Sequence, residues 1–271
     1  MCATREGEPA GPSYPDGRDE VRWLPITDER CGDDGFAGPA IGALHRVGDL
    51  VPVPETIVLT APVRHWRDLV RQRPADPFAE YAGLVEEPVS VRAWQIRPRR
   101  SDLPIGPVFN NLGPGTVAEA MLELLALAED GAREFPRLAF ALQRFTAAEA
   151  SAHVRAAPDG ERVRVQAFLG LAEQLAEPLH PDLVVLAGPE LAVREYRVAD
   201  KPTATVAAAG GTRTSTVPEL RRRAPALRVK TVQHLGSLTI AAARRLAVPV
   251  AAEFAVTDGE AVLLRCRPVP A

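Results

Sequence analysis

The pattern of the sequence changes at Phe135, after which short strand-like segments follow one another closely and limit the folds that the chain can adopt. These segments are RLAFALQRF, ASAHVRAAP, RVRVQAFLG, DLVVLAG, LAVREYRVA and TATVAAAGG. Short apolar or alternating runs separated by turn residues, such as the Pro-Asp-Gly at 158–160, are typical of antiparallel sheets. A helix is predicted over 229–247, and a hairpin closes the chain. Residues 135–271 are therefore predicted to form a strand-rich lobe with one long helix across it.

The preceding part of the chain has a different pattern, in which helices and strands are mixed. Helices are predicted over 37–48, from Pro62 onwards, and over 116–132, where Thr116 and Glu119 have the spacing of a capping box. Strands are predicted at VPVPETIVLTA and at 87–96, and the Gly- and Pro-rich stretch from 97 to 115 is predicted as a loop. We expect an α+β chain with a small α/β lobe at 31–134, a strand-rich lobe at 135–271 and a cleft between them. Residues 1–30, rich in Gly, Pro and charge, are predicted to be a flexible arm.

Composition excludes several classes of function. The net charge is −3, which disfavours nucleic acid as a partner. No apolar run reaches the length of a membrane span, and the N-terminus has no apolar signal segment. The three cysteines, Cys2, Cys31 and Cys266, are far apart and form no CxxC motif, so a reducing cytoplasmic location is expected.

The closing hairpin places an acid close to two bases. Glu253 lies in its first strand, and Arg265 and Arg267 lie in its second. A three-residue loop would set Glu253 directly opposite Arg265 on one face, where a charge-assisted contact would form. A two-residue turn would instead put them on opposite faces.

Five motifs in order give this chain a resemblance to a known family. GALHRVGDLVPVPETIVLTA, VSVRAWQ, FALQRF, QAFLGLAEQLAE and AAEFAVTDGEAVLLRCRP resemble successive motifs of the nucleotide-binding domain of phosphoenolpyruvate synthase and pyruvate phosphate dikinase. The resemblance runs from about residue 31 to the end and implies an ATP-grasp-like fold that holds a nucleotide between two lobes.

The resemblance also implies a set of site residues. The nucleotide-binding candidates are Arg92, Gln143, Lys201, Arg265 and Arg267. Arg92 and Glu253 are the catalytic candidates, and Glu253 is also the candidate metal ligand. The implied cofactors are ATP and Mg²⁺.

Several positions depart from the family pattern. Ala37 stands where the family has a phosphate-binding lysine, and Trp94 stands among the small residues of its VRSSA strand. Gln166 and Ala251 replace acids, and Arg265 replaces a glutamine. Because Mg²⁺ needs several hard oxygen ligands around one point, the Mg²⁺ ligands are depleted, and we expect an ion pair at the position of the metal site.

Two functions remain open on this basis. The first is a stand-alone ATP-dependent phosphotransferase or ligase that binds a nucleotide or another anionic small molecule in the cleft. The second is a degenerate domain without ATP and Mg²⁺ chemistry that acts as a binding or assembly subunit, with a partner protein or as a homodimer, or that does different chemistry in the same cleft. His153 is the histidine expected to face the cleft, and GGTRTST at 210–216 is predicted to be a flexible loop.

Overall fold

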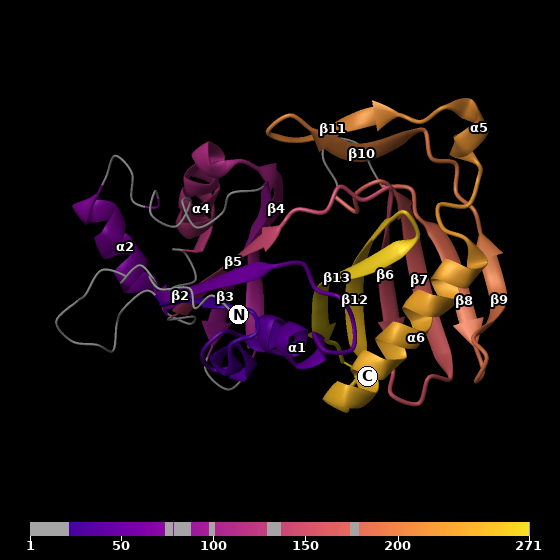
Figure 1. Ribbon diagram of the computed structural model, residues 1–271, viewed down its shortest axis with the longest axis horizontal. Coiled ribbons are helices and arrows are strands. Elements are labelled where there is room, and N and C mark those ends of the chain that lie inside the picture. Colours follow the sequence, from indigo (N-terminus) through magenta and orange to yellow (C-terminus); the bar gives the residue numbers. More distant parts are fainter. Residues whose placement is uncertain are drawn as a thin grey trace, which may run out of the picture.

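The computed structural model describes residues 22–73, 78, 88–97, 101–128, 137–173 and 179–270. Within these ranges the chain forms two antiparallel sheets that lie side by side along the long axis of the molecule, with a separate two-stranded hairpin beside them (Figure 1). All strand pairs are antiparallel, and helices cover the sheets, so the predicted α+β class is confirmed.

The first sheet has the strand order β1-β2-β5-β3-β4. Its strands are β1 (Arg22–Pro25), β2 (Thr56–Pro62), β3 (Val89–Arg97), β4 (Ser101–Leu112) and β5 (Arg137–Arg144). Helices α2 (Val63–Gln72) and α4 (Pro114–Ala128) pack against one of its faces around Trp66, Phe140 and Met121, which are fully buried. Val91 and Ala93 of β3 pack into this apolar core. Because side chains alternate along a strand, Ser90 and Arg92 point to the other face of the sheet.

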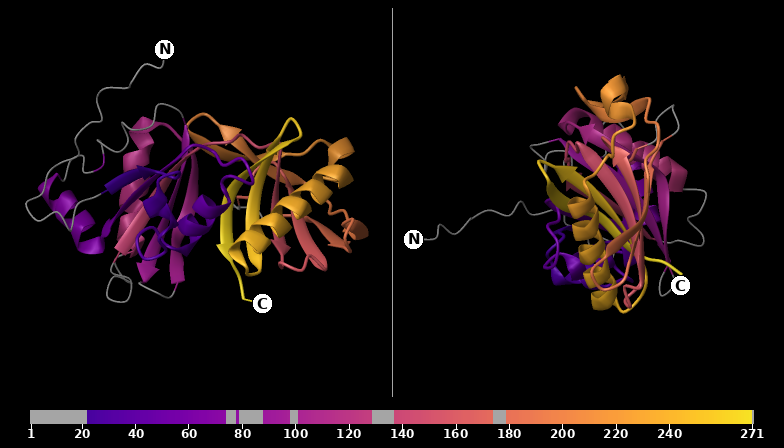
Figure 2. Two further views of the ribbon diagram at one scale, coloured as in Figure 1. Left: turned by 60° about the horizontal axis from the view of Figure 1, so that its bottom comes forward. Right: turned by 90° about the vertical axis from the view of Figure 1, so that its right-hand side faces the viewer.

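The second sheet has the order β13-β12-β6-β7-β8-β9. Its strands are β6 (Ala150–Ala156), β7 (Arg162–Leu169), β8 (Asp182–Ala187), β9 (Ala192–Arg197), β12 (Val250–Thr257) and β13 (Glu260–Pro268). Helix α6 (Val229–Leu246) lies across one face of this sheet (Figure 2), where alternate residues such as Val154, Val165 and Ala252 are buried. Helix α1 (Pro39–Val47) packs against β13 and joins the core of the second sheet to the first part of the chain.

The hairpin of β10 (Thr203–Ala208) and β11 (Gly211–Thr216) reaches back to the first sheet (Figure 1). Asn111, at the end of β4, has a left-handed backbone (φ 59°), and its side-chain amide donates to the carbonyls of Ala208 and Gly211 at the hairpin tip. At the base, a buried ion pair joins Lys201 Nζ to Asp182 Oδ1 at 2.6 Å. The short helix α5 (Glu219–Arg222) follows the hairpin.

Some sequence-based predictions differ from this architecture. The stretch 97–115 was expected to be a loop, but β4 occupies most of it; β4 is an edge strand, where Pro104 and Pro107 are tolerated although they cannot donate to a ladder. The segment 210–216 contains β11 and is not a flexible loop, because it pairs with β10 along its whole length.

The boundaries of the lobes also differ from those expected. Strand β5 lies between β2 and β3, so the change of sheet comes after residue 144 and not at 134. Of the predicted arm, residues 1–21 lie outside the described residues, whereas 22–25 form β1 on β2. Helix α4 begins at Pro114, and Thr116 Oγ1 donates to Gly113 O, so Thr116 is not the N-cap of a capping box.

Candidate functional site

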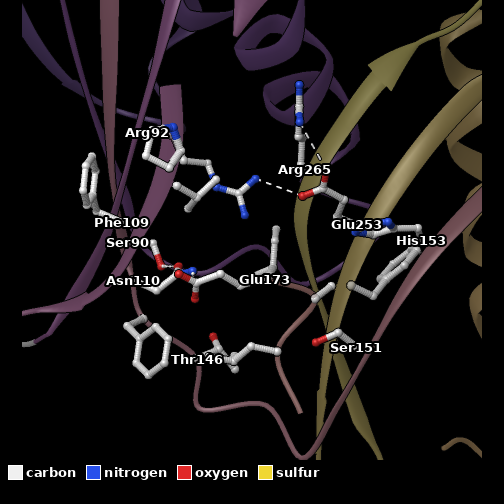
Figure 3. A pocket seen from close by; sticks show the side chains of 17 residues that line it. Ser90, Arg92, Phe109, Asn110, Thr146, Ser151, His153, Glu173, Glu253 and Arg265 are labelled. Carbon is white, nitrogen blue, oxygen red and sulfur yellow. Dashed lines mark hydrogen bonds and ion pairs between the residues drawn. The ribbon is translucent and has the colours of Figure 1, made fainter. Parts of the chain in front are cut away.

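A cavity of about 490 Å³ lies between the two sheets. Strands β3 and β4 line it from one side and β6, β12 and β13 from the other (Figure 3). The connection between β5 and β6 and the segment after β7 complete the wall with Phe145, Thr146 and Leu171. A volume of this size suits a small-molecule ligand, and a junction between lobes is a common place for one.

The terminal hairpin positions Glu253 and Arg265 through a bulge. Its turn has two residues, Asp258 and Gly259, both with positive φ (53° and 82°), as a tight hairpin turn requires. With such a turn alone, Glu253 and Arg265 would not face each other. The register shifts between Glu253 and Phe254, so that Leu264 is the extra residue and Glu253 comes to lie opposite Arg265. Of the two alternatives, the turn is the two-residue one, and the bulge nevertheless produces the expected contact between Glu253 and Arg265.

Two guanidinium groups hold the carboxylate of Glu253. Arg92 Nη1 donates to Glu253 Oε2 at 3.0 Å, and Arg265 Nη1 donates to Oε1 at 3.2 Å. Figure 3 shows Arg92 extending from the first sheet toward Glu253 on the second, so this contact bridges the two sheets. Arg92 is 8 % exposed, and the Nε atoms of Arg92 and Arg265 are buried without a hydrogen-bond partner among the described residues. Among the described residues each guanidinium donates only through Nη1, so the Nη2 group of each arginine remains available as a donor.

The electrostatics of this cluster favour an ionised acid and a neutral histidine. Burial alone would raise the pKa of Glu253, but the charges of Arg92 and Arg265 outweigh it and lower the pKa to about 2. Burial lowers the pKa of His153, which lies opposite Glu253 on β6, and the nearby arginines add to this effect against the attraction of Glu253. Near neutral pH, Glu253 is thus charged and His153 is uncharged.

A second polar group lines the cavity opposite this cluster. Ser90 Oγ donates to Asn110 Oδ1 at 2.6 Å, and Asn110 Nδ2 donates to Glu173 Oε2 at 2.9 Å. The carbonyl of Glu173 accepts from Thr205 Oγ1 at 2.8 Å, which ties this segment to the β10–β11 hairpin. Gly170 (φ 73°) allows the close approach, because a Cβ there would collide with the Thr205 carbonyl oxygen.

Sequence reasoning did not assign Ser90 and Asn110 to the site. Asn110 lay in a stretch expected to be a loop, so nothing indicated that it would line up with Ser90 on the neighbouring strand. The signal that could have found Ser90 is the alternation of β3, since Ser90 and Arg92 are two residues apart and must share a face.

Three of the predicted nucleotide-binding residues lie away from the cavity. Gln143 is buried within the first sheet and donates to Thr56 Oγ1 at 3.2 Å. Lys201 is buried in its ion pair with Asp182 at the base of the hairpin, and Arg267 is exposed one step along β13 from the cavity. Arg92, Arg265 and Glu253 line the cavity together, and His153 faces it as expected.

The residues present do not fit a Mg²⁺ site. Each oxygen of Glu253 already accepts from a guanidinium, and Ala251 offers no second carboxylate at the hairpin. Within the described ranges, no group of three or more His, Cys, Asp or Glu side chains could hold a metal ion. Ala37, at the position of the family lysine, is fully buried, and Trp94 lies in the core.

Comparison with known families gives a match for the region that contains the terminal hairpin. Residues 137–271 match the model of the pyruvate phosphate dikinase AMP/ATP-binding domain. This match covers residues 137–271 of the 271-residue chain. The match includes Glu253 and Arg265 and, with the two sheets beside the cavity, confirms the expected ATP-grasp-like fold. The wider resemblance from residue 31 remains a sequence-based prediction.

Solved structures similar to this chain include three ligases. These are the VanG D-Ala:D-Ser ligase of Enterococcus faecalis (10% identity, 90% of this chain and 54% of that chain, TM-score 0.38), the D-alanine–D-alanine ligase of Bacillus anthracis complexed with ATP (10%, 90% and 57%, 0.36) and an L-amino acid ligase of Bacillus licheniformis (10%, 76% and 42%, 0.38). The chain thus spans about half the length of these proteins. Comparison with curated protein sequences gives no match. In the described ranges, no helix has both the length and the apolar character needed to cross a membrane.

Proposed function

We propose that this pyruvate phosphate dikinase-like domain binds a nucleotide, or another small anion, in the cavity between its sheets without using Mg²⁺. The observation that carries the proposal is the placement of Glu253 between Arg92 and Arg265, each of which donates only through Nη1 within the described part of the chain. Two fixed positive charges stand at the point where the family resemblance implies a metal.

Arginine can take over part of the role of a cation in holding phosphate. A guanidinium is always charged, presents five donors in a planar fork and can contact a carboxylate and a phosphate at the same time. Arg92 and Arg265 can therefore keep Glu253 as a partner while their remaining N–H groups turn to a ligand oxygen. The apolar side of the cavity, with Phe109, Phe145 and Leu171, offers room for the base of a nucleotide.

A second candidate is an ATP-dependent phosphotransferase or ligase, with Arg92 and Glu253 as catalytic residues. The observation in its favour is that Glu173 and Gly170 of the family motif are retained and that Glu173 lines the cavity. Phosphoryl transfer depends on cationic stabilisation of developing charge. Because Glu253 is neutralised by two arginines, binding without transfer is the function that this geometry supports better.

The proposal also includes the cellular location and the assembly state of the domain. Cys31 and Cys266 are free and buried, and burial raises the pKa of each thiol, to about 11 and about 12 respectively. Such inert thiols agree with a cytoplasmic location. If the domain does not transfer phosphate, it would serve as a binding or assembly subunit for a partner protein or as a homodimer.

A thermal-unfolding titration with ATP, in Mg²⁺ and in EDTA, tests this function. A ligand at one hundred times its Kd stabilises the native state by about 2.7 kcal/mol, which corresponds to a shift of roughly 5–10 °C for a domain of this size. We expect the same shift in both buffers and a loss of most of it in the Arg92→Gln/Arg265→Gln variant.

The exposed Lys230 on α6 provides a control, since Lys230→Gln removes one positive charge far from the cavity lining. This variant should keep the full shift. No shift at millimolar ATP would contradict nucleotide binding, and a shift that needs Mg²⁺ would contradict the metal-free site.

A further inference from the structure

The face of the second sheet that α6 leaves uncovered carries a row of arginines across neighbouring strands. Arg267 on β13 pairs with Ala251 on β12, Ala251 pairs with Arg155 on β6, and Arg155 pairs with Arg164 on β7. Residues that pair across antiparallel strands share a face. We call Arg155, Arg164 and Arg267 the arginine row.

The arginine row is continuous with the cavity. One step along the same strands, the neighbouring row is Arg265, Glu253, His153 and Gln166. Positions two apart on a strand point to the same side, so Arg155 follows His153 and Arg267 follows Arg265 on one face. The influence of Arg155 on the pKa of His153 agrees with this closeness.

All three side chains of the row are exposed. On this sheet Glu253 pairs with Arg265, and Glu195 pairs with Arg197 at 2.7 Å. In the part of the chain that the structure describes, no carboxylate forms an ion pair with Arg155, Arg164 or Arg267.

The arrangement is unfavourable in the free protein. Arg155 and Arg164 are directly opposite each other, and like charges at such positions destabilise a sheet. Adjacent strands are about 4.8 Å apart, so the side chains of Arg155 and Arg164 start about 5 Å apart and that of Arg267 about 10 Å from Arg155. A compact ligand with several negative charges would relieve this repulsion, whereas a single charge could satisfy only part of the row.

The charge balance inside the cavity also favours the arginine row as the place where a polyanion binds. Its two arginines, Arg92 and Arg265, are balanced in number by Glu253 and Glu173, and His153 is held neutral. The cavity alone therefore offers little net attraction to a polyanion. The uncompensated positive charge lies outside it, on the arginine row.

We propose that the arginine row is a subsite for the polyphosphate portion of the ligand, with Arg155 and Arg164 as the residues that select polyphosphates over monophosphates. The inference rests on the proposed function and names its ligand class, a molecule with two or more consecutive phosphate groups. The contacts are charge-assisted hydrogen bonds from guanidinium to phosphate oxygen and need no metal.

Calorimetric titration of the full chain in EDTA tests the subsite, with ATP, AMP and inorganic tripolyphosphate as the probes. We expect tripolyphosphate and ATP to bind, AMP to bind at least tenfold more weakly than ATP, and the tripolyphosphate affinity to fall as salt is raised. The Arg155→Gln/Arg164→Gln variant should lose about tenfold in affinity for ATP and tripolyphosphate and little for AMP. Both residues are exposed, so the variant should fold, which circular dichroism checks.

Arg197→Gln is the matched control for a general effect of charge. Arg197 is exposed on β9, shares the open face and is two strands from Arg164. Equal losses in this control and in the Arg155→Gln/Arg164→Gln variant would overturn the subsite, as would equal affinity of wild type and that variant.

The outcomes separate the two proposals. ATP that binds equally well to wild type and the Arg155→Gln/Arg164→Gln variant would leave the proposed function intact and remove the subsite. Suppose that tripolyphosphate binds through the row and that ATP binds no better than tripolyphosphate. This result would support the subsite and contradict the proposal that the ligand is a nucleotide. If no probe binds, both proposals fail.

Discussion

Glu253 is the residue on which the site depends. It is bound on one side by an arginine from its own hairpin and on the other by Arg92 from the first sheet. The pair with Arg92 spans 161 positions of the sequence, so it forms only when the two sheets come together. The carboxylate of Glu253 therefore both stabilises the contact between the sheets and contributes a negative charge to the cavity.

The pKa of Glu253 predicts a loss of stability in acid. Its value in the folded protein is about 2, below the ordinary 4.5, so the unfolded chain binds the proton more readily. The stabilisation is complete above about pH 5 and is lost as the pH falls toward 2; its size is at most about 3 kcal/mol. Urea unfolding should be measured for wild type and Glu253→Gln between pH 7 and pH 3. We expect the difference between their free energies of unfolding to shrink as the pH falls.

Glu260→Gln is the control on the same hairpin, because Glu260 is exposed at the start of β13. The free energy of unfolding of this variant should depend on pH as that of the wild type does. A Glu253→Gln variant that is as stable as wild type at pH 7 would show that the two arginines do not depend on this carboxylate.

The residues of this cluster show what sequence could and could not reveal. The contact of Glu253 with Arg265 was predictable because both lie in one hairpin, although the bulge at Leu264 that creates it was not. Gln143 and Lys201 lie away from this cavity, because a motif predicts the strand but not which of its side chains face a cavity. Lys201 is instead used to neutralise the buried Asp182.

At the scale of elements, the β10–β11 hairpin is held over the junction of the sheets by its two ends. Its tip is bound by Asn111, and its base is held where Asp182 accepts from Lys201 Nζ and from the backbone N–H groups of Ala199 and Ala226. Thr205 in β10 also contacts the backbone of Glu173, which lines the cavity. The hairpin therefore supports one wall of the cavity.

Replacing Asn111 should loosen this hairpin. Asn111→Ala removes both hydrogen bonds to the tip, each worth about 1 kcal/mol, and places alanine in a left-handed conformation at a further cost of about 1 kcal/mol. We expect the free energy of unfolding to fall by about 2–3 kcal/mol and amide exchange in β10 and β11 to accelerate.

Asn111→Gly separates the two causes, because glycine accepts the backbone conformation but cannot make the hydrogen bonds. Amide exchange in the hairpin should be as fast in this variant as in Asn111→Ala. Unchanged exchange in both variants would show that Asn111 does not hold the tip.

The elements themselves were largely predictable, and the errors have one physical origin. Helices α1 and α6 and the strands of the second sheet follow from apolar periodicity, which reports local burial. Strands β4 and β11 were missed because Pro and Gly interrupt β4, Thr dominates β11, and the pairing of each depends on a neighbouring strand. For the same reason β5 was assigned to the wrong lobe, since its position between β2 and β3 is a tertiary property.

In the whole molecule, two sheets flank a cavity at which Glu253, the candidate metal ligand, is held by two guanidinium groups. Residues 137–271 match the pyruvate phosphate dikinase AMP/ATP-binding domain, and the geometry around Glu253 shows an ion-pair cluster in the matched region. We propose that Arg92 and Arg265 take the role of the divalent cation at this cavity.

The most direct test of that claim is a crystal structure of the protein with ATP and Mn²⁺, with anomalous diffraction used to locate the metal. We predict ATP in the cavity, Glu253 still in contact with Arg92 and Arg265, and no anomalous peak at the Glu253 carboxylate. A Mn²⁺ ion coordinated by Glu253, with Arg265 turned away from it, would contradict the claim.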